Sequence, residues 1–248
     1  MMNRKYTFIV LTYIAMQLSV FIGMPLFYVI GTKVLNIAPK EAEIQATGYW
    51  LVFSFLLGLA IVLFLLRNKE RQNKIERAEP LPLGISLAWA VGGIFLAFFA
   101  QILAVSIENM IGVKPGSENT QEILQMIELF PAIVLISSII GPILEEIVFR
   151  KVIFGTLYNR LPFGMAAVIS SIIFAFAHME PVHLILYTAM GFVFAFLYVK
   201  TKRIIVPIIA HVMMNTLVVV AQRYIPEDLE KNIQSFIHLV RWMGGFIS

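Results

Sequence analysis

The segment GPILEEIVFR, residues 141–150, carries three ionisable side chains in an otherwise apolar stretch. They are Glu145, Glu146 and Arg150, and the two carboxylates are of the type that can take a proton from water. A charged side chain at the centre of a bilayer costs about 3 kcal/mol on insertion scales. Three such residues within a short apolar segment therefore require a physical reason.

A histidine and a histidine–asparagine pair follow in later apolar segments. His211 and Asn215 are spaced i,i+4 and share a helix face, and Phe174 precedes His178 by one helical turn. Three helices could thus bring a carboxylate pair, an imidazole and an imidazole–amide pair to one point. Such a set contains the usual parts of an acid–base site.

Each group also has a purely structural interpretation. Glu146 and Arg150 are spaced i,i+4 and could form a buried ion pair that neutralises itself, which leaves Glu145 unexplained. His178 could serve helix packing, and His211 with Asn215 could make interhelical hydrogen bonds worth about 1 kcal/mol. Intramembrane ionisable residues are nevertheless functional by default.

The elements that position these residues are predicted to be membrane helices. The chain has 248 residues, 59% hydrophobic and 14% charged, with no cysteine, whereas soluble domains average roughly 25% charged residues. We expect an all-α, polytopic transmembrane helix bundle that forms one membrane domain over residues 1–248. The predicted spans are 6–30, 47–66, 82–106, 130–149, 163–179, 182–199 and 204–222.

The distribution of basic residues predicts the orientation of the bundle. With a cytosolic N-terminus and seven alternating spans, 13 of the 19 lysines and arginines lie inside and 6 outside, as the positive-inside rule requires. Residues 227–248 fit an interfacial amphipathic helix or an eighth span. The charged connector RNKERQNKIERAEPLP is the best candidate for a flexible boundary.

In the seven-span topology Glu145 and His211 lie in the cytosolic halves of their helices, whereas His178 lies near the outer end of its own helix. A common site therefore requires the helix over 163–179 to start deeper, to tilt, or to end inside the protein with the following HMEPV turn buried. That turn is not an HExxH zinc motif, because Glu180 is two residues after His178 and Pro181 breaks the helix. Glu180 and His183 are interpreted as turn residues.

Together the three motifs resemble those of one family of membrane proteases. EEIVFR fits EExxxR, FAFAH fits FxxxH and HVMMN fits HxxxN, in that order on successive membrane helices. This pattern is similar to the CAAX-protease and bacteriocin-processing family, CPBP or Abi, and most of all to its bacterial members. The resemblance covers residues 125–220, which would form the catalytic core.

The resemblance implies a role for each motif residue. Glu145 would be the carboxylate that activates water and His178 would assist it, while His211 and Asn215 would line the oxyanion site. Glu146, Arg150 and Phe174 would support this arrangement. The implied activity is that of an intramembrane endopeptidase in the bacterial plasma membrane. Its expected substrates are membrane-embedded or membrane-tethered peptides or proteins. The lipid bilayer is a further expected partner, and nucleic acid is not.

Other chemistries remain open at this stage. Glu145, His178 and His211 are also an acceptable zinc set, although a metal-free scheme without cofactor is favoured from the family. A carboxylate shielded from water is a better base than one in water, which suits that scheme. The competing classes are a proton-coupled transporter, in which Glu146 joins these three residues in a relay, and a non-catalytic membrane regulator.

Overall fold

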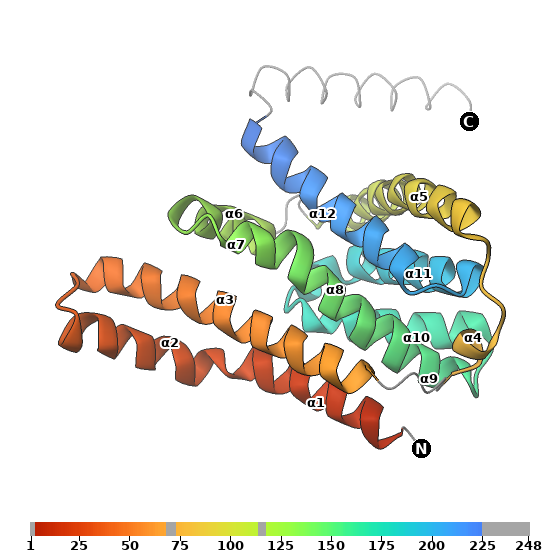
Figure 1. Cartoon of the computed structure of the whole chain (residues 1–248). Coiled ribbons are helices and arrows are strands. Elements are labelled where there is room, and N and C mark those ends of the chain that lie inside the picture. The colour runs from red at the N-terminus through yellow and green to blue at the C-terminus, as the bar shows by residue number, and fades with distance from the viewer. Residues whose placement is uncertain (1–2, 68–72, 114–117, 225–248) are drawn as a thin grey trace.

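The computed structural model describes residues 3–67, 73–113 and 118–224, and every regular element in these ranges is a helix. The expected all-α architecture is therefore confirmed, and Figure 1 shows the helices packed together as a bundle. The amphipathic helix expected over residues 227–248 lies outside the described residues.

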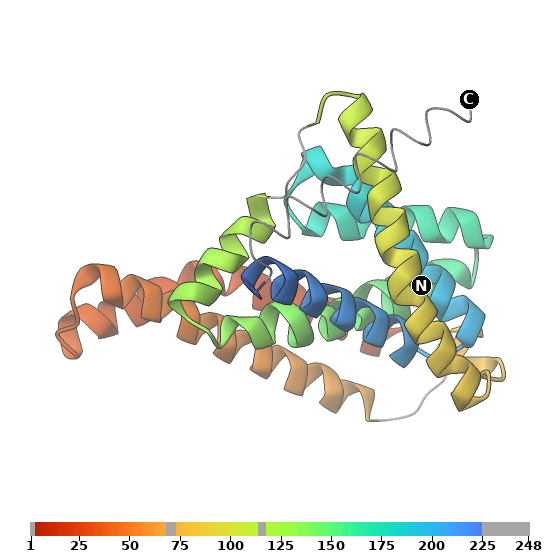
Figure 2. The ribbon, with the colours of Figure 1, turned by 90° about the horizontal axis from the view of Figure 1, so that it is seen from above.

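The N-terminal part of the chain forms a long helical hairpin. Its elements are α1 (Arg4–Leu18), α2 (Val20–Val29), the π-helix η1 (Ile30–Val34) and α3 (Pro39–Leu66). The first predicted span bends by 41° between α1 and α2. The bend falls at Ser19, whose hydroxyl donates to the Met16 carbonyl and accepts from the Trp50 indole, and such serine back-bonding bends helices. In Figures 1 and 2 the half of this hairpin that contains α2 and the start of α3 projects beyond the other helices.

The connector after α3 is anchored in its described part. The elements here are α4 (Lys74–Arg77) and α5 (Leu83–Met110). Asn73 is fully buried, caps the start of α4 and donates its amide N–H to the Lys151 carbonyl. Glu76 accepts from the Tyr6 hydroxyl and pairs with the Lys151 ammonium. These buried polar groups are held by partners inside the protein, while the flexible boundary expected over the whole connector stays a prediction.

The segment with the two glutamates is an irregular helical rod. Its elements are α6 (Glu118–Leu129), α7 (Ile133–Leu135), η2 (Ile136–Ile140), α8 (Gly141–Glu145), η3 (Glu146–Phe154) and α9 (Gly155–Tyr158). Two π-helical stretches, η2 and η3, flank the short helix α8. Pro142 lacks the N–H that an α-helix would use at this point, which favours a local break in the pattern. π-Helical turns occur often at functional sites, because they change which side chains face one neighbour.

The last three long helices complete the bundle. They are α10 (Phe163–Ala177), α11 (Leu184–Thr201) and α12 (Ile205–Tyr224), with the 3-10 turn η4 (Pro181–His183) between α10 and α11. α11 packs against α5, α10 and α12 and supplies much of the main core, including the fully buried Phe194. The helix that carries His211 and Asn215 and the helix that ends at His178 thus both pack against α11, and the rings of Phe174 and His211 lie 6.2 Å apart between their centroids.

The described helices are consistent with several membrane spans. Three are long and apolar enough to cross a membrane: Pro39–Leu66, Leu83–Met110 and Pro181–Thr201. The bent pair of α1 and α2–η1 adds a fourth. The helix α10 and the apolar part of α12 are shorter, and the predicted span 130–149 is divided by its π turns. The count of seven spans therefore stays a prediction.

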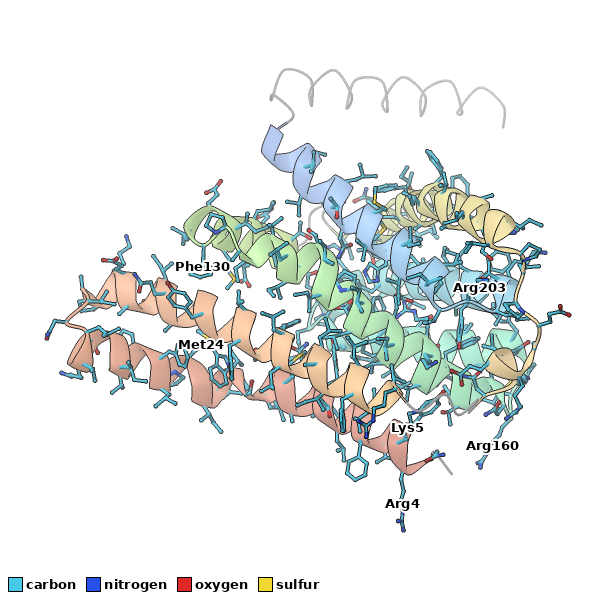
Figure 3. The ribbon with its side chains drawn as sticks, viewed as in Figure 1. Arg4, Lys5, Met24, Phe130, Arg160 and Arg203 are labelled. Atoms are coloured by element: carbon cyan, nitrogen blue, oxygen red, sulfur yellow. The ribbon has the colours of Figure 1, made fainter. Side chains whose placement is uncertain are left out.

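The surface separates into an apolar outside and one basic end. Phe21, Ile22 and Phe95 are at least 71% exposed, and side chains of this kind on a membrane bundle face lipid. Figure 3 shows the basic residues Arg4, Lys5, Arg160 and Arg203 at one end of the bundle, whereas Met24 and Phe130 lie toward the other. This clustering agrees with the predicted inner loops, while the cytosolic position of that end stays a prediction.

Gly191 allows α11 to approach α10 closely. A Cβ atom at this position would lie 2.7 Å from both the Cβ and the Oγ of Ser171. We expect Gly191→Ala to lower the free energy of unfolding by about 1–3 kcal/mol, because the Cβ of Ser171 cannot move without moving α10. Thermal unfolding in detergent micelles measures this. Gly164→Ala is the matched control, since nothing lies within 4 Å of a Cβ there, and equal losses in both variants would contradict the prediction.

Candidate active site

A cavity of about 480 Å³ lies within the bundle, and residues of all three motifs line it. The lining includes Glu145 at the end of α8, Phe174 on α10, His178 at the end of α10, and His211 and Asn215 on α12. His178 is the C-cap of α10, and in the turn that follows Glu180 is 8% exposed. Met179 and Val182 in the same turn are 86% and 60% exposed, so the turn is buried only in part. The buried HMEPV turn expected as one route to a common site is therefore wrong.

Glu145 faces the cavity. Its side chain is 20% exposed, and its Oε2 lies 3.8 Å from Nε2 of His211. This separation exceeds a direct hydrogen bond. The carboxylate is therefore close to the imidazole but not held against it, and it remains accessible from the cavity.

Glu146 and Arg150 lie behind the cavity wall and are 0% and 2% exposed. Arg150 Nε is 3.3 Å from Glu146 Oε2, so the ion pair expected from the i,i+4 spacing is present. The guanidinium also lies over the rings of Phe174 and Phe194, at 4.0 Å and 5.3 Å from their centroids. Within the described ranges its two terminal nitrogens make no hydrogen bond. The arginine therefore balances the charge of Glu146 and stacks on the core.

His211 contacts both glutamates. Its Nδ1 lies 2.9 Å from Glu146 Oε1, and a carboxylate can only accept, so Nδ1 carries a proton. Its ring stacks on Phe194 with centroids 4.7 Å apart. Glu146 thus fixes the orientation and the Nδ1 proton of the imidazole, as the buried aspartate does in a catalytic triad. The other nitrogen, Nε2, faces the carboxylate of Glu145.

His178 is held between two aromatic rings. Its Nδ1 donates to the Phe174 carbonyl at 2.9 Å, which leaves Nε2 as the acceptor in the neutral ring. The Phe174 ring meets it edge-on with centroids 4.4 Å apart, and the Tyr187 ring stacks on it at 4.1 Å. The imidazole therefore has one defined orientation beside the cavity.

Asn215 contributes an amide to the same cavity. Its Nδ2 donates to the Ser137 carbonyl on η2 at 3.2 Å. An amide nitrogen carries two N–H groups, so a second donor remains for a ligand in the cavity. The bond to Ser137 fixes the plane of the amide and hence the direction of that second donor.

The described residues include no group of three His, Cys, Asp or Glu side chains that could hold a metal ion. The alternative zinc set of Glu145, His178 and His211 borders one cavity without forming such a group. In addition, Nδ1 of each histidine is engaged with a protein acceptor. Metal dependence is therefore a question for a chelation experiment.

The cavity extends beyond the expected core of residues 125–220. Tyr13 and Gln17 on α1 and Gln101 on α5 also line it. Polar glutamines within apolar spans were the signal that could have located this wall. The interpretation of Glu180 and His183 as simple turn residues was also incomplete, because both side chains are buried.

Comparisons with known proteins agree with the motif pattern. A family model described as type II CAAX prenyl endopeptidase Rce1-like matches residues 127–217. YdiL of Bacillus subtilis (strain 168), which carries the provisional name of a membrane peptidase, is 48% identical over 222 residues, 89% of this chain and 90% of that protein. The membrane-embedded CAAX protease MroQ of Staphylococcus aureus (strain USA300) is 34% identical over 194 residues, 75% of this chain and 78% of that protein. No solved structure matches the chain.

Proposed function

This chain belongs to the Rce1-like CAAX endopeptidase family of membrane proteases, and from this premise we propose that it cleaves membrane-associated peptides or proteins by a metal-free, glutamate-dependent mechanism. One observation carries the proposal. Glu145, His178, His211 and Asn215, from three separate segments, border one cavity. That set contains a base for water and donors for an oxyanion.

In this mechanism Glu145 is the general base. It takes a proton from a water molecule, whose oxygen attacks the carbonyl carbon of the scissile peptide bond. His178, with its Nδ1 proton engaged by the Phe174 carbonyl, presents Nε2 as an acceptor for the second hydrogen of that water. The proton held by Glu145 then passes to the leaving amine nitrogen as the C–N bond breaks, so the products are a carboxyl group and an amine.

His211 and Asn215 stabilise the tetrahedral intermediate in this scheme. Asn215 donates its second amide N–H, since the first is used by the Ser137 carbonyl. His211 donates from Nε2 when the ring is protonated, and Glu146 holds the opposite nitrogen at 2.9 Å. Oxyanion donors of this kind act strongly in a site shielded from water.

The substrate class follows from the surroundings of the cavity. Helices with apolar, exposed outer faces enclose it, and a site of this kind admits an extended chain that is already at the membrane. We therefore assign membrane-embedded or membrane-tethered peptides and proteins as substrates, and the cell membrane as the place of cleavage.

The test is peptide cleavage in reconstituted liposomes. Wild type and His211→Ala would each be incubated with a panel of membrane-tethered peptides, with and without a strong zinc chelator. We expect wild type to cleave equally well in both conditions, and His211→Ala to be slower by about 10²- to 10³-fold, as for loss of an oxyanion donor.

Two results would contradict the proposal. Cleavage that chelator abolishes and added zinc restores would assign the site to a metalloprotease. Proton flux across the liposomes that requires Glu145, in the absence of cleavage of any peptide, would favour the transporter alternative.

A further inference from the structure

A buried carboxylate–histidine pair lies near the candidate site and takes no part in the mechanism above. Glu108, in the last turn of α5, is 1% exposed, and its Oε2 is 2.8 Å from Nδ1 of His183, which is 6% exposed. Its Oε1 accepts from the backbone N–H of Leu186 at 2.9 Å. Leu186 belongs to the first turn of α11, so Glu108 satisfies an N–H group that a helix start leaves without an intrahelical partner.

Stability alone is a weak explanation for this pair. Replacing such a buried polar pair by apolar side chains is often neutral or stabilising, because removing a carboxylate and an imidazole from water is costly. What the pair does achieve is a long-range connection, since Glu108 and His183 are 75 residues apart in the chain. It ties α5 to the turn between α10 and α11 and fixes where α11 begins.

That turn also carries a second buried contact. The Tyr187 hydroxyl donates to Glu180 Oε2 at 2.6 Å, and the two residues are 7% and 8% exposed. Tyr187 directly follows Leu186, so the ring sits on the helical turn that Glu108 holds. The same ring stacks on His178 at 4.1 Å.

His178 depends on these contacts because its helix ends there. It is the C-cap of α10, and the next residue, Met179, has a φ of 58° and is 86% exposed. No further helical turn supports the imidazole. Its orientation is set by Phe174, one turn earlier, and by the ring of Tyr187.

We propose that Glu108 and Glu180 are positioning residues for His178. Glu108 acts through His183 and the start of α11, and Glu180 acts through the Tyr187 hydroxyl, so that the imidazole stays at the angle at which it meets the reacting water. This inference rests on the proposed function, because it takes His178 as a participant in catalysis.

Cleavage kinetics test the proposal through a conservative rescue. Glu180→Gln keeps an oxygen that can accept from Tyr187, whereas Glu180→Leu removes it. We expect Glu180→Gln to cleave with nearly the wild-type kcat, and Glu180→Leu to lose roughly tenfold or more in kcat with little change in KM, as for a misplaced catalytic group. Equal kcat values in wild type and Glu180→Leu would overturn the proposal.

Histidine-selective NMR tests the same proposal without using activity. The chain has four histidines, so the ring signals of a histidine-labelled sample in lipid nanodiscs can be assigned with single His→Gln variants. We expect the His178 signal to move in Glu180→Leu and in Glu108→Gln, and to stay in place in the exposed control Glu79→Gln. Glu108→Gln is used because its amide oxygen can still accept from the Leu186 N–H and so maintain the fold, whereas its NH2 group cannot accept from Nδ1 of His183, so the link to the turn is changed.

A His178 signal that is unmoved in both variants would overturn the positioning role, whatever their activity. His178→Gln distinguishes this failure from that of the proposed function. Full cleavage by His178→Gln would overturn the catalytic assignment of His178 and with it the inference. Loss of cleavage by His178→Gln, together with unmoved signals in the other variants, would overturn the positioning role alone.

Discussion

Glu145→Gln is expected to lower the kcat of peptide cleavage by about 10²- to 10⁴-fold while the protein stays folded. Glutamine has nearly the same size as glutamate, but its amide cannot take a proton from water. The side chain is 20% exposed and faces the cavity, so the substitution leaves the packing of the bundle unchanged. The contact with His211 Nε2 is long, at 3.8 Å, and contributes little to the fold.

The experiment compares cleavage and substrate binding for wild type, Glu145→Gln and Glu79→Gln. Glu79 is exposed on the connector and serves as the matched control, which should cleave at the wild-type rate. We expect Glu145→Gln to bind a tethered peptide with wild-type affinity, because only the base is removed. Wild-type cleavage by Glu145→Gln would show that another group activates water, and a non-catalytic regulator would tolerate the change in every assay.

Local spacing predicted the parts of the site that lie on one helix. The i,i+4 rule correctly paired Glu146 with Arg150, and it placed His211 and Asn215 on one face, where both border the cavity. The Glu146–Arg150 pair forms although both residues lie in the π-helix η3, because residues four apart still lie on one side of this wider helix.

The contact of both glutamates with one imidazole could not be predicted in this way. In a regular α-helix neighbouring side chains point about 100° apart, which left the second carboxylate without a partner. The structure places a π-helical stretch directly after Glu145, and His211 lies where Oε1 of Glu146 and Oε2 of Glu145 both face it. This arrangement depends on how α12 packs against α8, a tertiary fact that spacing does not encode.

Long-range partners account for the other omissions. The contact between Glu108 and His183 is formed only in the folded chain, and nothing in the local sequence links residues so far apart. The cavity wall from α1 and α5 was not predicted for the same reason, because Tyr13, Gln17 and Gln101 lie far in the chain from the three motifs. Polar side chains within every apolar span, and not only the last four, deserve to be considered together.

Arg150→Met is expected to lower the free energy of unfolding by about 3–5 kcal/mol. The substitution leaves the carboxylate of Glu146 fully buried without its counter-charge. It also removes the guanidinium from the faces of Phe174 and Phe194, whose rings contact the imidazoles of His178 and His211. Unfolding in detergent micelles, followed by heat or by denaturant, measures the loss. Arg160→Met, at an exposed position, is the control and should be close to wild type.

The double variant Glu146→Gln/Arg150→Met identifies the cause of that loss. Glutamine is uncharged, so no charge remains buried, and its oxygen can still accept from Nδ1 of His211. If the buried charge is the cause, the double variant is more stable than Arg150→Met alone, and the two substitutions are strongly non-additive. If both variants are equally unstable, the lost stacking on Phe174 and Phe194 is responsible instead. Arg150 would then act as a packing side chain for the rings that hold His178 and His211, and charge balance at Glu146 would be secondary.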